Sequence, residues 1–350
     1  MDYAKPRYPI QQVNKSGRKL VEFIKDSSIT PAQIQFDISV VENWRASHNH
    51  PLNAFYVTLK NRATKVSVKA LPAQRIKRLS SIAKKLYFEK DMKLSQMQDI
   101  GGCRAVMPTI ADVNRLLETY NANPVTHLRN KEKDKNYISE PRDTGYRGIH
   151  LKFKYTGKGR SVPWDGLKIE IQLRTLLQHK WATAVEAAGT FTNQALKSNL
   201  GSKEWLRFFA LMSSVFALRE GCALVPETPN THEELCMEIR TLNEQHHIQA
   251  VFAQYHKIIP KLKGARNAKY FLITLDPIKR ETTIKGFKDG ESQKANAEYT
   301  SLEQAYLKNP TQVVLVQVAN VNALGRAYPN YFLDTQDFLR EIAKITGVPV

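Results

Sequence analysis

Residues 136–155 read NYISEPRDTGYRGIHLKFKY, and residues 168–189 read KIEIQLRTLLQHKWATAVEAAG. The first stretch opens as a polar loop in which Gly145 permits a sharp turn beside Tyr146. It then alternates apolar and polar residues, and the start of the second stretch alternates in the same way. This period of two predicts two strands of one sheet, the second leading into a helix.

One face of the second predicted strand is polar, because Glu170, Gln172 and Arg174 share it. Burying such a face costs free energy unless it is wet or functional. One interpretation is therefore an edge strand with a solvated face. The other is a working face, which is favoured by the earlier polar loop DIGGCR with its Asp99 and Arg104.

The charge of the chain indicates a polyanionic partner. Its 350 residues include 52 Lys and Arg against 33 Asp and Glu, a formal net charge of +19. This balance favours nucleic acid, nucleotides or an acidic membrane surface. The three cysteines fit reduced thiols, and neither a membrane span nor a signal peptide is evident. We therefore expect a soluble, cytoplasmic protein that does not bind membranes.

The order of the remaining patterns predicts the fold class. A helical flank with a basic arm occupies residues 1–65, with helices expected at 18–26 and 31–64. Val66–Leu71 is expected to be a strand and residues 72–88 a helix whose start carries Arg75 and Lys77. Strands and helices then alternate, which predicts an α/β or α+β fold with a mixed central sheet flanked by helices.

Four segments in this part resemble the RelA/SpoT alarmone-synthetase fold, which is nucleotidyltransferase-like. They are QRIKRLSSIAKK, QDIGGCRAV, NYISEPRDTGYRGIHLKF and IEIQLRTLLQHKWATAVE, in matching order and spacing. Each is weak alone, but four in order are specific. The resemblance implies a pyrophosphokinase that transfers pyrophosphate from ATP to a ribose hydroxyl. It implies a synthetase domain at residues 66–224, followed by a connecting helix at 225–266.

The resemblance also implies roles for the residues of the ATP side. Asp99 would be a Mg²⁺ ligand, and Glu170 a Mg²⁺ ligand or the general base. Mg²⁺ in proteins is bound by one or two carboxylates together with phosphate oxygens, so the pair suits it. The remaining ATP-binding residues divide into Arg75 and Arg104, which would stack on the adenine, and Lys77, Ser81 and Lys85, which would hold the phosphates.

On the acceptor side, Tyr146 would stack on the acceptor base. Arg142 and His150 would contact the acceptor or the transferred phosphates, and Gln172 would position the site. Thr144 departs from the Asn that many synthetases carry before Gly-Tyr, which puts a guanosine-nucleotide acceptor in question.

Beyond the synthetase region the chain turns helical. Residues 205–218 predict a buried helix and residues 233–263 a long packing helix. His232 and Cys236 stand one helical turn apart, but with no second cysteine pair a zinc site is disfavoured. PKLKGARN is expected to be a basic turn and a domain boundary.

Residues 267–350 predict a smaller C-terminal α+β regulatory domain. Two strands, a helix, a strand and a closing helix follow one another, and Tyr328 and Tyr331 flank Pro329 before the closing helix. This tail is similar to that of the CapRel type of fused toxin–antitoxin. That resemblance implies that the tyrosine pair occupies the ATP site until a phage protein, the major capsid protein being one candidate, binds the tail.

We therefore expect a toxin that transfers pyrophosphate from ATP to the 3′ CCA end of tRNA, blocks translation and serves anti-phage defence. The alternative enzyme is a (p)ppGpp or (p)ppApp synthetase. A third interpretation is a catalytically inactive RNA- or nucleotide-binding regulator, against which the intact carboxylate and arginine pairs argue. No His-Asp hydrolase motif is present, so we expect no alarmone hydrolysis.

Overall fold

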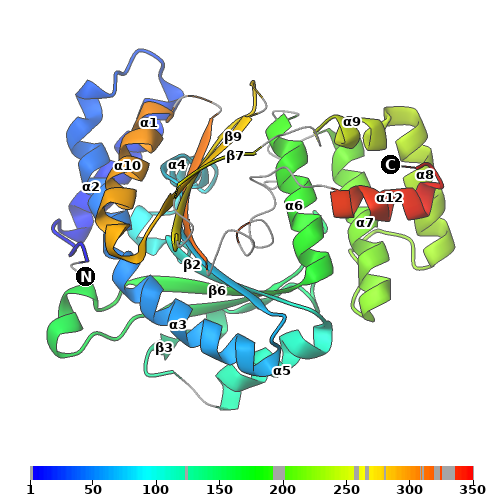
Figure 1. Cartoon of the computed structure of the whole chain (residues 1–350), viewed down its shortest axis with the longest axis horizontal. Coiled ribbons are helices and arrows are strands. Elements are labelled where there is room, and N and C mark those ends of the chain that lie inside the picture. The colour runs from blue at the N-terminus through cyan, green and yellow to red at the C-terminus, as the bar shows by residue number, and fades with distance from the viewer. Residues whose placement is uncertain are drawn as a thin grey trace.

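The computed structural model describes residues 3–122, 125–191, 202–255, 260–264, 268–279, 281–307, 309, 311–318, 324 and 336–349. A large mixed sheet organises this part of the chain (Figure 1). The strands are β1 (Leu71–Ile76), β2 (Gly101–Met107), β3 (Leu128–Arg129), β4 (Lys135–Asn136), β5 (Ile149–Lys154), β6 (Lys168–Thr175), β7 (Pro260–Gly264), β8 (Tyr270–Asp276), β9 (Glu281–Phe287) and β10 (Gln312–Gln317).

The strands run in the order β3-β5-β6-β2-β1-β10-β8-β9-β7, and β4 also pairs with β5. β2 and β6 are parallel, as are β7 and β9, while the other pairs are antiparallel. The predicted mixed sheet is thus confirmed. The predicted solvated edge strand is wrong, because β6 lies between β5 and β2 and only 6% of Glu170 and 8% of Arg174 are exposed.

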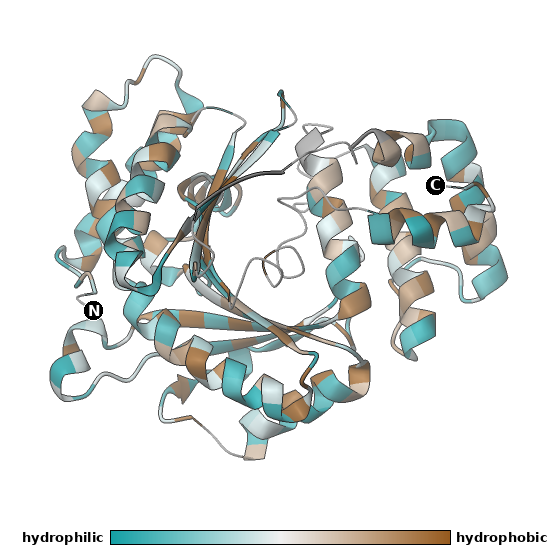
Figure 2. Ribbon diagram, in the orientation of Figure 1, coloured by the Kyte–Doolittle hydropathy of each residue, from teal (hydrophilic) through white to brown (hydrophobic). Residues whose placement is uncertain are grey.

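Helices α3 (Asn49–Val66) and α5 (Ile110–Ala122) cover one face of this sheet. Their apolar sides join the inward residues of β2, β5 and β6 in one core that includes Phe55, Leu116, Phe153 and Ile171. Figure 2 shows apolar and hydrophilic residues alternating along both helices, as expected for helices with one buried face. The opposite face of the sheet carries the polar row and lies toward α6 (Leu176–Phe191).

The strands of the C-terminal part continue the same sheet. β10 pairs with the free edge of β1, with Gln74 opposite Gln317 and Arg75 opposite Val316. Helix α10 (Ser292–Ala305) covers β8 and β10 through a small core that includes Leu272 and Tyr299. The strands expected at 269–276, 281–287 and 311–319 are present as β8, β9 and β10, although residue 319 lies outside the described residues. The helix expected at 301–308 begins earlier, at Ser292, and ends at Ala305, and residue 308 lies outside the described residues. The domain boundaries stay a prediction.

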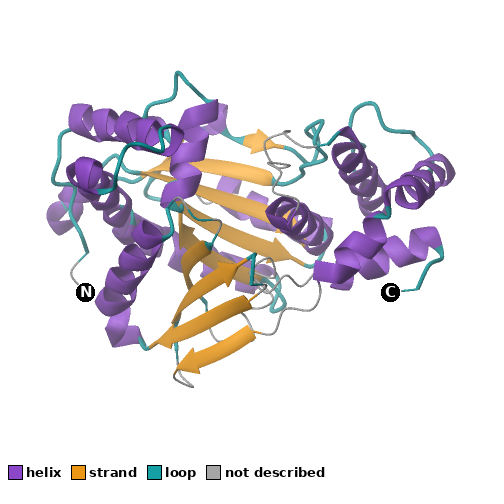
Figure 3. Ribbon diagram, turned by 90° about the horizontal axis from the view of Figure 1, so that it is seen from above, coloured by secondary structure: helices purple, strands orange, loops and turns teal. Residues whose placement is uncertain are grey.

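A helical group lies at one end of the molecule, apart from the sheet (Figure 3). It contains α7 (Lys203–Glu220), α8 (His232–His246), α9 (Ile248–Tyr255) and the closing helix α12 (Gln336–Thr346). The buried helix predicted at 205–218 is confirmed as α7, whose Phe209 and Phe216 pack on Phe338 of α12. The C-terminal helix is thus anchored on elements that begin near the site.

Several predicted elements were wrong in their limits. The strand expected at Val66–Leu71 is the end of α3 and a turn, and the helix expected from residue 72 begins only at Leu79, as α4 (Leu79–Phe88). The apolar spacing of Ile76, Leu79 and Ile82 suits a helix, but pairing with β2 and β10 on both edges makes 71–76 a strand.

The long helix expected at 233–263 is broken, because His247 adopts a left-handed conformation with φ +50° and separates α8 from α9. The basic turn was expected at residues 260–267, but Pro260–Gly264 form strand β7, which pairs with β9, and residues 265–267 lie outside the described residues.

The N-terminal helices also differ from those expected. Helix α1 spans Ile10–Lys25 and begins earlier than the predicted helix at 18–26, whereas the single helix expected at 31–64 is divided at His48 into α2 (Gln35–Ser47) and α3.

His232 and Cys236 contact each other, but within the described ranges no group of three or more His, Cys, Asp or Glu could hold a metal ion. Among the same residues no helix combines the length and apolarity that crossing a membrane requires.

Candidate active site

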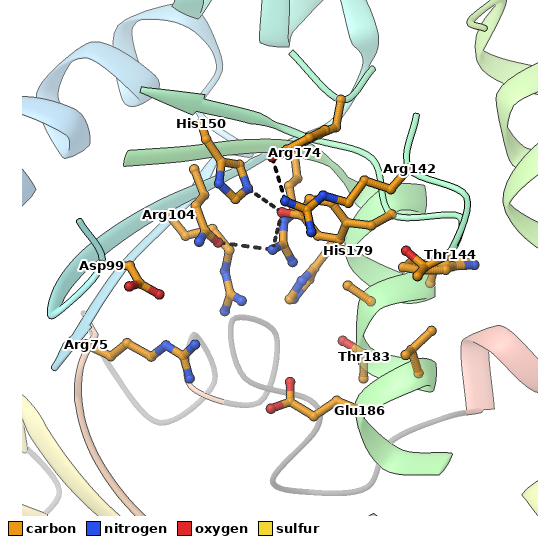
Figure 4. A pocket seen from close by; sticks show the side chains of 16 residues that line it. Arg75, Asp99, Arg104, Arg142, Thr144, His150, Arg174, His179, Thr183 and Glu186 are labelled. Carbon is orange, nitrogen blue, oxygen red and sulfur yellow. Dashed lines mark hydrogen bonds between the residues drawn. The ribbon is translucent and has the colours of Figure 1, made fainter. Parts of the chain in front are cut away.

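A cavity of about 300 Å³ lies between the polar face of the sheet and helix α6 (Figure 4). Strands β1, β2, β5 and β6 form its floor, and α6 and the loop before β5 form its wall. The predicted site residues that line it are Arg75, Asp99, Arg104, Arg142, Tyr146, His150 and Gln172. Side chains separated by up to 97 positions in the sequence thus face one space.

Strand register explains why these side chains meet. His150 is opposite Gln172, and Gln172 is opposite Arg104, so three neighbouring strands place them side by side on one face. In the next row Glu170 is opposite Gly102, which is opposite Arg75. A Cβ built on Gly102 would meet nothing nearer than the Arg75 carbonyl oxygen at 4.0 Å, so the absent side chain leaves open space between Glu170 and Arg75.

The two predicted adenine-stacking arginines come from adjacent strands. Arg75 projects from β1 and Arg104 from β2, and both side chains point into the cavity (Figure 4). The sequence predicted that Arg75 and Lys77 lie at the start of a helix, and this prediction is wrong. Arg75 lies within β1, and Lys77 lies in the short connection to α4.

Asp99 holds both lysines of the predicted phosphate-binding set. Lys77 Nζ donates to its Oδ2 at 2.6 Å and Lys85 Nζ to its Oδ1 at 3.2 Å. Burial alone would raise the pKa of Asp99, but the two ammonium groups outweigh it and hold the pKa well below its usual range. Ser81 stands one helical turn before Lys85 on α4. Asp99 lines the cavity. The residues that line it do not include Lys77, Ser81 or Lys85.

Glu170 is the most buried carboxylate of the site and both of its oxygens are engaged. His150 Nδ1 lies 3.0 Å from Oε1, and Gln172 Nε2 donates to Oε2 at 2.8 Å. Burial would raise the pKa of Glu170, but the hydrogen bond and charge of His150 outweigh burial and lower it. Glu170 is therefore held as an anion, which suits a metal ligand better than a general base.

The charge state of His150 follows from the same contacts. Burial by itself would lower the pKa of His150, but Tyr146 and Glu170 on its two ring nitrogens raise it to about 9. Its Nε2 lies 2.5 Å from the Tyr146 hydroxyl, which also accepts from Arg174 Nη2 at 2.7 Å. The hydroxyl of Tyr146 is thus fixed within the protein, and its ring lines the cavity.

The loop that carries Tyr146 turns at Gly145, as predicted. Gly145 has φ +88°, and a Cβ there would lie 2.8 Å from the Trp181 ring, so a side chain is excluded on both grounds. The Arg142 guanidinium lies 4.6 Å from the Tyr137 ring and donates to its hydroxyl. Tyr137 in turn meets Tyr146 edge to face, so the loop is held by its own aromatic contacts.

Several lining residues were not predicted as site residues. Arg174 shares the face of Glu170 and Gln172, and its donation to Tyr146 and Gln172 completes the network. Helix α6 contributes a stripe at helical spacing that the sequence displays, namely His179, Ala182, Thr183 and Glu186. The spacing of polar residues along 176–191 would have indicated this stripe. Tyr328 and Tyr331 lie outside the described residues.

The donor set fits a magnesium ion. Asp99 lines the cavity, and Glu170 lies on the floor strand β6. The charge of Asp99 opposes the ionisation of Glu170 and would raise its pKa. A divalent cation held by the two carboxylates would relieve this repulsion and would supply positive charge for phosphate oxygens. The lysine and histidine partners of the two carboxylates balance their charge.

One segment of the chain is similar to a known protein family. Residues 74–195 match the family described as "Region found in RelA / SpoT proteins", and this segment contains the floor strands and α6. Residues 74–195 are therefore similar to that region, and the match supports a pyrophosphokinase activity of that type. None of the curated proteins compared with the chain matches it.

Parts of the chain are also similar to solved structures. The small alarmone synthetase 2 from Bacillus subtilis is 20% identical, with a TM-score of 0.43, over 51% of this chain and 94% of that one. The small alarmone synthetase 1 from Bacillus subtilis, solved with its product pppGpp, is 19% identical with a TM-score of 0.40, over 61% and 97%. A GTP pyrophosphokinase family protein from Streptococcus pneumoniae is 18% identical with a TM-score of 0.40, over 51% and 87%.

Proposed function

We propose that this chain is an ATP-dependent pyrophosphokinase whose acceptor is the 3′ CCA end of tRNA. The observation that carries the enzymatic part is the arrangement around Gly102. The Glu170 anion and the Arg75 cation flank an open space above it, and Asp99 borders the same cavity. The reaction needs such a place, because the transferred phosphates carry negative charge that cations must balance.

In this proposal the two arginines of β1 and β2 bind the adenine, since planar guanidinium groups stack on purine rings. Lys77 and Lys85 face the phosphates from the side of α4. The acceptor hydroxyl attacks the β-phosphorus and an O–P bond forms while the hydroxyl proton passes to solvent. The bond between the β-phosphorus and the α-phosphate oxygen breaks, and AMP leaves. Mg²⁺, held by Asp99 and Glu170, would supply charge neutralisation at the phosphate oxygens.

The acceptor side of the cavity suits a nucleobase that arrives from solvent. The Tyr146 ring is available for stacking because its hydroxyl is held by His150 and Arg174. Arg142 lines the same end. RNA is favoured over a free nucleotide by the +19 charge and by the exposed basic side chains of the N-terminal arm, Lys5, Arg7, Lys15, Arg18 and Lys19. A (p)ppGpp or (p)ppApp synthetase is the alternative, because a stacked tyrosine accepts any base.

Incubation with γ-labelled ATP and, separately, deacylated tRNA, GDP or AMP tests the proposal. We expect label on tRNA and none on a matched tRNA that lacks the terminal adenosine. Label on GDP or AMP alone would favour the alarmone alternative. Label on none of the acceptors, from a protein that binds ATP and is free of the C-terminal restraint proposed below, would favour an inactive nucleotide-binding regulator. The Glu170→Gln variant serves as the blank for every acceptor.

We also propose that the C-terminal part restrains this activity, which would make the chain a toxin fused to its own inhibitor. A tyrosine ring next to Pro329 could fill the slot between Arg75 and Arg104, because guanidinium groups stack on aromatic rings as well as on purines. A phage protein, such as the major capsid protein, that binds only the withdrawn tail would then activate the enzyme and stop translation. The phage protein can shift the equilibrium between the docked and the withdrawn tail only as far as its affinities for these two states differ.

The restraint is best tested in the full chain. Removal of everything from Lys269 would also remove β10, which pairs with β1. We expect the double replacement of Tyr328 and Tyr331 by Ala to raise the affinity for ATP and to arrest growth on expression. A double variant that is folded, harmless in cells and unchanged in ATP affinity would show that these tyrosines are not an inhibitor.

A further inference from the structure

The helix that carries Ser81 and Lys85 lacks an N-terminal cap of its own. The N-cap position of α4 is Arg78, no side-chain cap bond is formed there, and the first turn contains no acidic residue. Helix N-termini leave backbone N–H groups unpaired and favour negative charge nearby. A basic N-cap residue therefore makes this helix dependent on a partner from elsewhere in the chain.

That partner is Glu303 of helix α10, 224 positions further along. Its Oε1 accepts a hydrogen bond from the backbone N–H of Leu79, the first residue of α4, at 2.5 Å. Its Oε2 accepts from Arg45 Nη2 of α2 at 2.6 Å. The side chains of Arg45 and Glu303 are 4% and 6% exposed, so the pair is shielded from solvent.

Arg45 extends the contact to the other lysine of the site. Its Nε donates to the backbone carbonyl of Lys77 at 3.0 Å, and its Nη2 also donates to the Tyr299 hydroxyl of α10 at 2.7 Å. The backbone N–H of Lys77 donates to the Ile100 carbonyl oxygen. The backbone of Lys77 is thus fixed from two directions while its ammonium group meets Asp99.

We infer that Glu303 and Arg45 are positioning residues for the phosphate-binding side of the site. They act on Lys77 and on α4 with Lys85, and they touch neither the cavity nor its lining. The C-terminal part is accordingly a component of the ATP site as well as its proposed inhibitor. In Figure 1, α10 and α2 lie at the same end of the molecule, where this contact is made.

The inference rests on the proposed function only in naming ATP as the ligand that Lys77 and Lys85 bind. The contact is buried, and a displacement of α10 would remove the cap of α4 and the counter-charge of Arg45 together. Since small misplacements of binding groups have large effects on substrate use, α10 is well placed to transmit a change in the C-terminal part to Lys77 and Lys85.

Glu303→Gln in the full chain tests the inference, with Glu341→Gln as a matched control. Glu341 also lies on a C-terminal helix, is 9% exposed at its side chain and pairs with an arginine of the preceding part, Arg219, but at α7 rather than at the site. We expect Glu303→Gln to weaken ATP binding by at least about tenfold, with the KM for the acceptor unchanged. Glu341→Gln should lower the melting temperature without changing ATP affinity.

Because Glu303→Gln leaves the Arg45 charge buried, a second variant carries Arg45→Met as well, which removes both charges. We expect it to regain stability while ATP affinity stays low, because the Lys77 carbonyl has lost its donor. Recovery of ATP affinity together with stability, or equal loss of affinity in Glu303→Gln and Glu341→Gln, would overturn the inference.

Amide hydrogen exchange provides a measurement without ATP. Exchange at Leu79 and in the first turn of α4 should accelerate in Glu303→Gln and stay unchanged in Glu341→Gln. If the wild type binds no ATP, the proposed function fails while this measurement still decides whether Glu303 holds α4. Unchanged exchange in a folded Glu303→Gln protein would contradict the inference.

Discussion

Glu170 and His150 form a buried ion pair in which Nδ1 of the imidazole lies 3.0 Å from Oε1 of the carboxylate. The two residues belong to adjacent antiparallel strands, and their pairing keeps the glutamate charged in a place that burial would otherwise make neutral. Since Gln172 engages the other oxygen, the carboxylate is fixed in direction as well as in charge. A residue held in this way is prepared for a cation or for developing positive charge.

Glu170→Gln keeps the shape of the side chain while removing its charge. We expect pyrophosphate transfer to fall by at least about 10³-fold with the fold intact, because the lost anion acts where the transition state needs it. Initial rates with γ-labelled ATP measure the loss. Glu186→Gln, in the same cavity but on α6, is the control and should retain most activity. Transfer by Glu170→Gln within about tenfold of wild type would show that this glutamate is not required.

Gly101 and Gly102 are adjacent and should respond in opposite ways. A Cβ on Gly101 would lie 2.5 Å from the Ile169 side chain, so Gly101→Ala should lower the melting temperature. A Cβ on Gly102 meets open space on the cavity side, so Gly102→Val should stay folded and lose activity by about a hundredfold or more. Thermal unfolding and transfer rates separate the two effects. Full activity in Gly102→Val would mean that the space above this glycine is not used.

Arg75 and Arg104 are expected to act on ATP and not on the acceptor. Replacement of either by Ala should weaken ATP binding by about tenfold or more, because each contributes one stacking surface. Arg142→Ala, at the opposite end of the cavity, should raise the KM for the acceptor with little change in ATP affinity. Calorimetric titration of ATP and acceptor-dependent rates would resolve this. Equal effects of all three variants on ATP would contradict the assigned orientation.

The N-terminal arm should contribute to RNA use through charge. Replacement of Lys15, Arg18 and Lys19 by Gln should reduce transfer to tRNA, with little effect on ATP affinity, and the difference from wild type should shrink at high salt. The exposed lysines Lys279, Lys288 and Lys294 form a control triple. If both triples reduce tRNA transfer equally, net charge rather than the arm is responsible.

His48 makes the stability of the protein depend on pH. Burial lowers its pKa from 6.5 to about 4 and outweighs the contact of its Nδ1 with the Trp44 carbonyl oxygen at 2.7 Å, which by itself would raise the pKa, so the neutral ring is the native form. The unfolded chain binds the proton more readily, so stability is complete above pH 6.5 and is lost as the pH falls toward 4. Between pH 7 and 5 the loss should be about 2 kcal/mol.

Thermal or urea unfolding at a series of pH values measures this loss. His48→Gln cannot titrate, so its stability should change less with pH than that of the wild type, even if it is lower throughout. Parallel pH profiles for the two proteins would show that His48 is not the group responsible.

The sequence alone determined two of the four floor strands, β5 and β6, and the amphipathic helices around them, because periods of 2 and 3.6 report local burial directly. It also predicted the two carboxylates, the two arginines and the Tyr146 loop, whose residue types suit one chemistry. It could not assign residues 71–76, where a helical apolar spacing was overridden by pairing with β2 and β10. Nor could it show that β6 is internal, since alternation describes one strand and not its neighbours.

Only the tertiary structure decided which side chains meet. Register places the empty space above Gly102 between Glu170 and Arg75, and no local pattern specifies register across strands. The same holds for Glu303, which caps a helix 224 positions earlier. Glu303 is one of two glutamates on α10 and is ordinary in the sequence, because the missing cap of α4 and the group that replaces it come together only when distant segments pack.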